Sequence, residues 1–257
     1  MLALLRTRRW AGFTVTVIVA IIAFGLLSLW QWHRADQKRA QRIELQTAIA
    51  APPVPLGAVD LPQAGGITAV DEWRHVAVTG TYDPASQVLV RKRPLDARNG
   101  FWVMTALKGS SGRTVWINRG WLATSGDALS TPPTPKAPPG AVTVSGFLRP
   151  FEEADAASNQ GLPAGQIAAA GPGALPSTAD AFPGYVQLER STATQDGLVP
   201  LPLPTVDESR NVSYAVQWLL FAAVAIGGWF FFLRREAKED AEIAAGAPSI
   251  AEATQPT

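Results

Sequence analysis

The sequence predicts a membrane protein of the α+β class, in which two transmembrane helices flank an extracytoplasmic, antiparallel β-domain that is barrel-like or sandwich-like. Two segments without a charged residue, 10–32 and 211–233, stand near the two ends of the 257-residue chain. Between them, short apolar strand candidates recur at intervals of about ten residues and are separated by turn-forming residues. No helical periodicity intervenes to build strand–helix–strand units, so the strands are expected to form antiparallel hairpins.

Each charge-free segment is long enough to cross a bilayer. At a rise of about 1.5 Å per residue each extends for about 34 Å, and the hydrocarbon core is about 30 Å thick. Aromatic residues that favour the membrane–water interface stand near the ends of the segments: Trp10, Trp30, Trp32, Tyr214, Trp218 and Trp229. Both segments are therefore predicted to be transmembrane helices.

Basic residues predict that both termini are cytoplasmic. Three precede the first segment and three follow the second: Arg6, Arg8, Arg9, Arg234, Arg235 and Lys238. Four more follow the first segment on the outer side, where the long domain that comes after them reduces their influence on orientation: Arg34, Lys38, Arg39 and Arg42. A cleaved signal peptide is the alternative, but its small-x-small site at residues 48–50 lies far beyond the apolar run. We expect an uncleaved, two-pass protein of a bacterial plasma membrane.

The expected organisation follows from these boundaries. A helical extension and a Pro/Gly linker are predicted between the first span and the β-domain, because helix-forming residues continue as far as Ala50. The segments are a cytoplasmic N-terminus (1–9), a first span (10–32), the extension and linker (33–66), the β-domain (67–210), a second span (211–233) and a largely disordered cytoplasmic tail (234–257). Strands are predicted at 73–82, 87–93, 100–107, 113–122, 141–148 and 185–189, with loops at 125–140, 154–183 and 196–208.

Residues 114–122 form the most distinctive strand candidate. Its apolar and β-branched residues alternate on both faces, which predicts a central strand. It contains Asn118, Arg119, Gly120 and Trp121, and the glycine predicts a positive φ or a β-bulge that aims its neighbours at the edge of the sheet. We expect the Arg119 guanidinium to lie over Trp121 or Trp116 in a cation–π contact.

Catalytic chemistry is not expected. The chain has no cysteine, which excludes disulfides, thiolate catalysis and Cys-ligated metals. Its two histidines, His33 and His75, are far apart in the sequence, and Lys108 with Ser110 or Ser111 lies in a predicted turn. The acids Glu152, Glu153 and Asp155 are expected to be solvated. The basic run 91–93, with Arg98, is interpreted as a solvated hairpin tip, or otherwise as a contact for anionic headgroups or a partner's acids. No nucleic acid is expected outside the cytoplasm.

Polar and aromatic residues gather at the outer end of both predicted spans. Trp30, Arg34 and Gln37 share one helical face, with Gln31, His33 and Lys38 beside it. On the second span Asn211, Tyr214 and Trp218 share a face, with Gln217 nearby. These stripes predict either interfacial anchoring with interhelical hydrogen bonds, or a site between the helices and the β-domain that holds an amphipathic ligand.

Six short motifs stand in order along the chain: Trp30-Gln31-x-x-Arg34 with Lys38, Gly80-x-Tyr82, Asn118-Arg119-Gly120-Trp121, Gly146-x-Leu148-Arg149, Gly184-Tyr185-Val186-Gln187-Leu188 and Tyr214-x-x-x-Trp218. With the two spans, they resemble the surfeit-locus (Surf/Shy) family of cytochrome c oxidase assembly factors over about residues 10–235. The resemblance implies a factor that assists haem a delivery or insertion into oxidase subunit I without catalysis. Its implied partners are subunit I, the haem a synthesis machinery and membrane lipid. A membrane-anchored binding module for another envelope complex is the alternative.

The chain departs from the family pattern at three positions. Ser28 and Ala106 stand where relatives often carry Gly and Pro, and Asn211 stands where many carry the His suspected to ligate haem. Because His33 is the remaining histidine near the membrane, we expect it to ligate any haem a that binds transiently. Arg34 and Lys38 would then pair with the propionates, while Trp30 and Trp218 stack on the macrocycle. Partner or structural roles are expected for Gln31, Asn118, Arg119, Gly120, Trp121, Asn211 and Tyr214.

Overall fold

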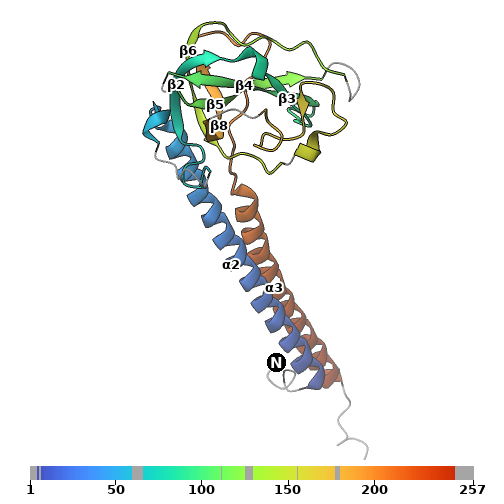
Figure 1. Cartoon of the computed structure of the whole chain (residues 1–257). Coiled ribbons are helices and arrows are strands. Elements are labelled where there is room, and N and C mark those ends of the chain that lie inside the picture. The colour runs from blue at the N-terminus through green and yellow to red at the C-terminus, as the bar shows by residue number, and fades with distance from the viewer. Residues whose placement is uncertain are drawn as a thin grey trace, which may run out of the picture. The chain divides into compact units, whose positions relative to one another are not determined.

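The computed structural model describes residues 5, 7–59, 66–110, 112–124, 130–154, 156–176 and 180–246. The chain forms two units: a helical unit of residues 1–42 and 205–257, and a β-domain of residues 43–204. Figure 1 shows the two long helices and the strands of the β-domain. Predictions for Arg6, Ser111, Asp155, residues 60–65 of the linker and residues 247–257 of the C-terminal tail lie outside the described residues.

The two helices contain the predicted spans. α2 (Arg8–Ala50) continues past residue 32 because residues 33–50 are good helix formers. It ends at Ala50 because Pro52 and Pro53 follow shortly after. α3 (Ser209–Gly246) begins just after Asp207, whose carboxylate accepts hydrogen bonds from the backbone and hydroxyl of Ser209, both at 2.8 Å. Both helices are long and apolar enough to cross a membrane.

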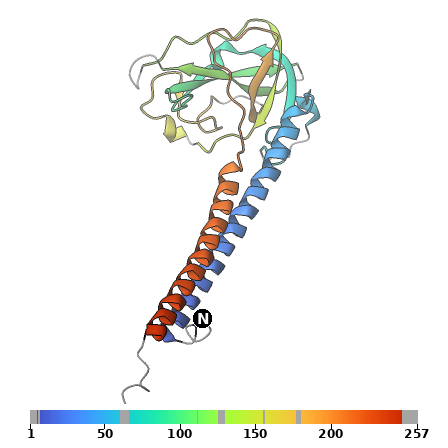
Figure 2. The ribbon, with the colours of Figure 1, turned by 180° about the vertical axis from the view of Figure 1, so that it is seen from behind.

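The two helices run in opposite directions beside each other (Figure 2). Small and aromatic residues make the contacts along this seam. Trp229 Nε1 donates to Thr14 Oγ1 at 3.0 Å, and Trp218 stacks on Phe24 with ring centroids 5.7 Å apart. Ser28 is buried, and its hydroxyl donates to the Ala215 carbonyl at 2.9 Å. Small residues let helix backbones approach closely in a bilayer. Ser28 therefore adds an interhelical hydrogen bond where the helices meet.

The β-domain is one mixed sheet of eight strands in the order β1-β2-β6-β8-β5-β4-β3-β7, with a further pairing between β2 and β4. Because β2 pairs with both β6 and β4, the pairings β2–β6–β8–β5–β4 return to β2. The strands are β1 (Val54–Pro55), β2 (His75–Tyr82), β3 (Val88–Val90), β4 (Gly100–Gly109), β5 (Thr114–Ala123), β6 (Ala141–Arg149), β7 (Gln166–Ile167) and β8 (Ala181–Ser191). Short 3₁₀ helices are η1 (Leu56–Ala58), η2 (Pro84–Ser86) and η3 (Ala156–Asn159).

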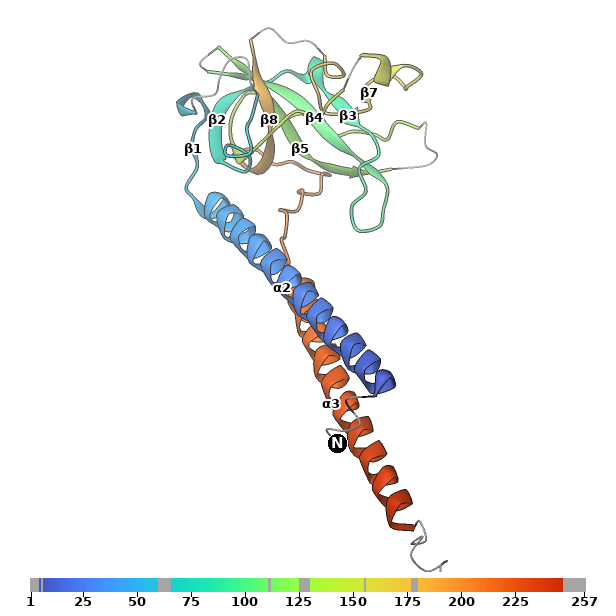
Figure 3. The same cartoon turned by 90° about the horizontal axis from the view of Figure 1, so that it is seen from below.

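The prediction of a purely antiparallel sheet is wrong. β5 and β8 pair in parallel, as do β1 with β2 and β3 with β7. The short strands β1 and β7 lie at opposite ends of the sheet (Figure 3). Parallel neighbours need a long connection, and β5 is joined to β8 through β6 and the stretch after it, whose described residues contain no α-helix. The predicted loop 154–183 also proves to contain η3, β7 and the start of β8.

β5 is central, as its sequence pattern predicts. It pairs with β4 on one side and β8 on the other. Residues 114–121 are all buried. Val115 and Ile117 belong to one hydrophobic cluster, while Trp116 belongs to another. Both faces of the strand are therefore covered, which places the polar residues Asn118 and Arg119 inside the protein.

Candidate functional site

The Asn-Arg-Gly-Trp segment, residues 118–121, contains a β-bulge in β5. Val103 of β4 pairs with Gly120 and Met104 pairs with Asn118, so Arg119 is the additional residue. Gly120 has a φ of 143°, and a Cβ there would lie 2.8 Å from the Val199 carbonyl oxygen. Both features favour glycine. The predicted bulge and positive φ are therefore confirmed, and the bulge redirects the Arg119 side chain.

Arg119 is a buried cation whose described partners are neutral. It is 3% exposed. Its guanidinium donates to four oxygens from three segments of the chain: Gln195 Oε1 at 2.8 Å, Gln87 Oε1 at 2.8 Å, Pro135 O at 3.2 Å and Lys136 O at 3.0 Å. The planar guanidinium presents its donors in a fixed fork, so one side chain holds three segments together. The arrangement is that of a structural cross-link for the segments around β5.

The predicted contact between Arg119 and Trp116 or Trp121 is wrong. The guanidinium carbon of Arg119 lies 5.6 Å from the centroid of the Tyr82 ring. Trp121 instead lies 5.8 Å from the guanidinium of Arg98, and its indole Nε1 donates to the Arg93 carbonyl at 2.6 Å. The bulge is the reason for the difference, because it turns Arg119 inward rather than to the edge of the sheet.

Tyr82 lies beneath Arg119 and has a perturbed acidity. Burial raises the pKa of Tyr82 to about 12, although the nearby Arg119 charge opposes the shift. Burial also lowers the pKa of Arg119 below its ordinary value. The Tyr82 hydroxyl has no hydrogen-bond partner among the described residues. Deprotonating this phenol in the folded protein would leave a phenolate in a largely dry environment, which links alkaline pH to stability.

Stability is expected to fall between pH 10 and 12 in a way that depends on Tyr82. The unfolded chain releases the phenolic proton near pH 10 and the folded chain retains it to about pH 12, so unfolding becomes easier as the pH rises through this window. At pH 11 the Tyr82 contribution to this loss is about 1 kcal/mol relative to pH 9. Urea unfolding of Tyr82→Phe should show a smaller loss than the wild type, whereas the exposed-site control Tyr214→Phe should lose as much as the wild type. Identical losses in Tyr82→Phe and wild type would contradict the account.

Two groups predicted to be solvated are in fact paired. Arg93 forms an ion pair with Glu152, and its guanidinium lies 4.1 Å from the centroid of the Trp102 ring. A Glu152 carboxylate oxygen also accepts a hydrogen bond from Ala170 N at 2.7 Å. These side chains are 19% and 30% exposed. The fully solvated interpretations of Arg93 and Glu152 are therefore wrong, because both side chains join the β3–β4 connection to the segment after β6. Lys92 and Arg98 remain exposed.

His75 opens β2 and joins it to the end of α2. Its Nδ1–H donates to the Ala51 carbonyl at 2.9 Å, and its Nε2 lies 3.1 Å from Glu189 Oε2. Within the part of the chain that the structure describes, no group of three or more His, Cys, Asp or Glu side chains is placed to hold a metal ion. His75 therefore makes a structural contact in the β-domain.

The polar residues at the end of the helix pair fall into two sets. The first lies along the seam, where Asn211 Nδ2 donates to Gln31 Oε1 at 2.8 Å and Lys38 Nζ donates to the Asp207 carbonyl at 3.4 Å. Trp218 belongs to the same seam through Phe24 and Phe221. These residues therefore hold the two helices together. Of the two alternatives predicted for the polar stripes, their contacts match the interhelical hydrogen bonds rather than a ligand site.

The second set lies on an exposed face of α2. Trp30 is 59% exposed, and His33 and Arg34 are also exposed. These residues lie within one stripe of the helix surface, with Arg34 Nη1 donating to Gln37 Oε1 at 3.3 Å. Tyr214 is 44% exposed on α3. The structure therefore brings together Trp30, His33 and Arg34 but assigns Lys38 and Trp218 to the seam.

The residues present do not fit a haem site built from all five predicted side chains. Trp218 already has an aromatic neighbour on the seam, and Lys38 already has a carbonyl partner. Asn211 is engaged with Gln31. A haem held by this pair of helices would have to use the face that carries Trp30, His33 and Arg34.

Sequence reasoning missed the acid that pairs with the basic residues of α2 beyond the first span. Glu208 Oε1 is 2.8 Å from Arg42 Nη2 and 3.8 Å from Arg39 Nε. The pairing offsets positive charge that follows the first span on the predicted outer side. Gln87 and Gln195, the side-chain partners of Arg119, were also missed. A buried arginine in an apolar strand is a signal that such oxygens must be nearby, but it does not say which residues supply them.

Two long apolar helices and a mixed sheet define an α+β protein whose candidate membrane spans precede and follow the β-domain in the sequence. A model of the SURF1 family matches residues 18–223. The chain is 27% identical over 250 residues to an uncharacterized SURF1-like protein of Mycobacterium tuberculosis, a match that covers 96% of this chain and 92% of that protein. A SURF1-like protein of Dictyostelium discoideum is 30% identical over 118 residues, or 44% of this chain and 43% of that protein.

The chain belongs to the SURF1 family, because the family model covers most of its length and reaches into both candidate spans. This confirms the resemblance drawn from the six motifs. The structure also explains one of those motifs physically: Gly146 lies at a register shift between β6 and β8, and a Cβ there would be 2.1 Å from the Gln187 carbonyl oxygen.

Proposed function

We propose that the protein is a cytochrome c oxidase assembly factor that assists the delivery of haem a to oxidase subunit I, or its insertion there, without catalysing a reaction. The observation that carries the proposal is family membership over residues 18–223, since SURF1 proteins are in general oxidase assembly factors. Subunit I and the haem a synthesis machinery are the proposed partners. The two apolar helices support a membrane location, where such partners reside.

The arrangement of the helix residues supports a division of tasks. Ser28, Gln31, Lys38, Asn211 and Trp218 make contacts along the seam and are proposed to keep the helices paired. The exposed face with Trp30, His33 and Arg34 is left to meet a partner or a haem within the membrane boundary. In this proposal, His33 would ligate the iron and Arg34 would attract a propionate.

A deletion strain separates this proposal from the alternative of a binding module for another envelope complex. We expect the reduced-minus-oxidised spectrum of its membranes to lose the haem a band while the b and c bands remain. The wild-type gene supplied in trans should restore the band. An unchanged haem a band would refute the assembly proposal and favour the alternative.

The proposed topology places the protein in a bacterial plasma membrane with both termini in the cytoplasm, following the basic residues that flank the spans. A cysteine placed at Ser110, an exposed residue of the β-domain, should react with an impermeant thiol reagent in intact cells. A cysteine at Ala241, an exposed residue of α3 beyond the span, should react only after the cells are opened. The native chain has no cysteine to give background. The reverse labelling pattern would overturn the topology.

Direct haem binding through His33 makes a separate prediction. After co-expression with haem a synthesis, His33→Ala should retain several-fold less haem than wild type, judged by the Soret absorbance per protein, because the residue that would hold the iron is lost. His75→Ala is the matched control, since His75 lies in the β-domain and contacts Ala51 and Glu189. Equal haem content in wild type and His33→Ala would remove His33 from the proposal.

A further inference from the structure

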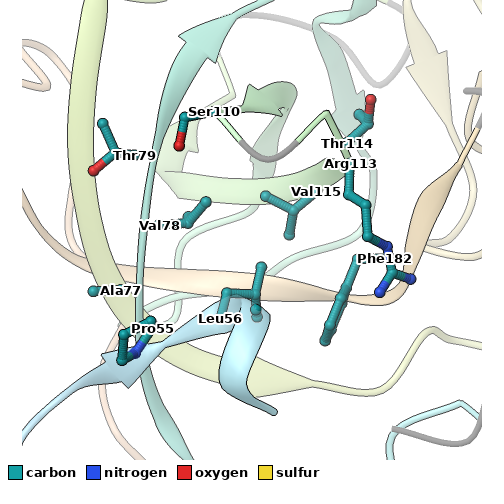
Figure 4. Close-up of a pocket in the computed structure, with 11 residues that line it drawn as sticks. Pro55, Leu56, Ala77, Val78, Thr79, Ser110, Arg113, Thr114, Val115 and Phe182 are labelled. Atoms are coloured by element: carbon teal, nitrogen blue, oxygen red, sulfur yellow. The ribbon is translucent and has the colours of Figure 1, made fainter. Parts of the chain in front are cut away.

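The β-domain contains a pocket of about 390 Å³ where the edge of β2 has no continuous neighbour. Val76 and Ala77 of β2 pair with β1, and Gly80, Thr81 and Tyr82 pair with β4. Val78 and Thr79 lie between these two pairings, where the Thr79 carbonyl accepts a hydrogen bond from Ser110 N at 2.9 Å, and both residues line the pocket. Interrupted pairing thus opens the side of the sheet between η1 and the first residues of β5 and β8 (Figure 4).

The inner wall of the pocket is part of the hydrophobic core. Leu56, Val115 and Phe182 line it, and these side chains are 9%, 1% and 3% exposed. All three belong to the larger hydrophobic cluster of the β-domain. A ligand that enters the pocket therefore meets aliphatic and aromatic surface that is already held in place by the fold.

A cation stands at the mouth of this apolar pocket. The guanidinium carbon of Arg113 lies 5.5 Å from the centroid of the Phe182 ring, and Figure 4 shows the Arg113 side chain extending toward that ring. Within the described ranges of the chain, no carboxylate pairs with Arg113, and the hydroxyls of Ser110 and Thr114 make no hydrogen bond. The contact with Phe182 holds the charge beside the apolar wall rather than away from it.

We propose that this pocket binds a small amphipathic carboxylate. Its apolar body would lie against Leu56, Val115 and Phe182, and its carboxylate would meet the Arg113 guanidinium, which is built to bind carboxylates through two parallel hydrogen bonds. A neutral molecule would leave the cation unmatched, and a simple inorganic anion would leave the apolar wall exposed. The inference rests on the β-domain alone and does not depend on the proposed role in oxidase assembly.

The test is a fluorine NMR titration of the full chain in lipid nanodiscs with 3-(4-fluorophenyl)propanoate, with empty nanodiscs to subtract partition into lipid. We expect saturable binding to the wild type, at least tenfold weaker binding to Arg113→Gln, and unchanged binding to the control Arg190→Gln, whose side chain is 82% exposed in the same domain. The corresponding neutral alcohol should bind at least tenfold more weakly than the acid. Inorganic phosphate should not compete.

A second variant tests the pocket rather than the charge. Gly57 lines the pocket, and a Cβ there would meet no atom within 4 Å, so Gly57→Phe adds a ring at the pocket wall whose Cβ does not clash with the chain. This variant should abolish binding while its thermal unfolding matches that of the wild type. Binding that survives Gly57→Phe, equal affinity of Arg113→Gln and wild type, or a signal no greater than that of empty nanodiscs would each overturn the proposal.

Discussion

Replacing Arg119 by methionine is expected to lower the free energy of unfolding of the β-domain by about 3 kcal/mol or more. The substitution keeps an unbranched, apolar side chain of moderate length but removes every donor of the guanidinium. Gln87, Gln195 and the carbonyls of Pro135 and Lys136 would then lose their partner in a region where Arg119 itself is 3% exposed. A buried acceptor left without a donor costs about 1–3 kcal/mol.

Two further variants separate the cross-link from the charge. Arg119→Lys retains a positive charge but lacks the planar fork, so it cannot reach the same four oxygens and is expected to be destabilised to an intermediate degree. Arg190→Met is the matched control, because Arg190 is an exposed arginine of the same domain. Urea unfolding followed by tryptophan fluorescence measures all three. If Arg119→Met were as stable as Arg190→Met, Arg119 would not be a structural cross-link.

The second large effect is expected for Gly146→Ala. A Cβ at this position would lie 2.1 Å from the Gln187 carbonyl oxygen and 2.9 Å from the Gln187 carbonyl carbon, both backbone atoms of the neighbouring strand β8. The contact can be relieved only by moving β6 away from β8, at the register shift between Ser145 and Gly146. Since overpacked positions that force backbone shifts cost about 1–3 kcal/mol or more, we expect a loss in the upper part of that range.

Gly57→Ala is the matched control for Gly146→Ala. Gly57 is in the same domain, but a Cβ there would meet no atom within 4 Å. Its stability should stay within about 0.5 kcal/mol of the wild type. Thermal unfolding of the two variants side by side checks the prediction. Equal unfolding temperatures for Gly146→Ala and Gly57→Ala would show that β6 and β8 do not approach as closely as the structure indicates.

Local sequence patterns were sufficient to predict the helices and the central strand. Segment length and the absence of charge identify the apolar parts of α2 and α3, and neither property depends on distant contacts. Alternating apolar residues on both faces identify β5 as central, and the glycine after Arg119 identifies the bulge. These features are set by the residues of the elements themselves.

The parallel pairing of β5 with β8 was not predictable in the same way. A strand that follows a long connection can join either edge of a sheet in either direction, and the residues of β8 carry no signal of their partner. The position of the Arg119 side chain likewise depends on oxygens from three separate segments of the chain. Such contacts are fixed by the assembled domain, so the sequence indicates a buried cation without showing what satisfies it.

The helix faces illustrate how one spacing can mislead. The stripe of Trp30, Arg34 and Gln37 is regular, but it lies on the exposed side of α2. The side that faces α3 carries Ser28, Gln31, Ala35, Lys38 and Arg42, at alternating spacings of three and four residues. The small residues Ser28 and Ala35 are the signal that identifies this seam, because close helix packing favours small side chains.

The haem a content of subunit I tests the central proposal most directly. Subunit I would be purified through a tag from a strain that lacks the gene for this protein, and from the same strain carrying the wild-type gene. Haem a per subunit I would then be measured from the pyridine haemochrome spectrum. The account predicts subunit I with severalfold less haem a in the deletion strain, and full content when the gene is restored. Subunit I with the same haem a content in both strains would contradict it.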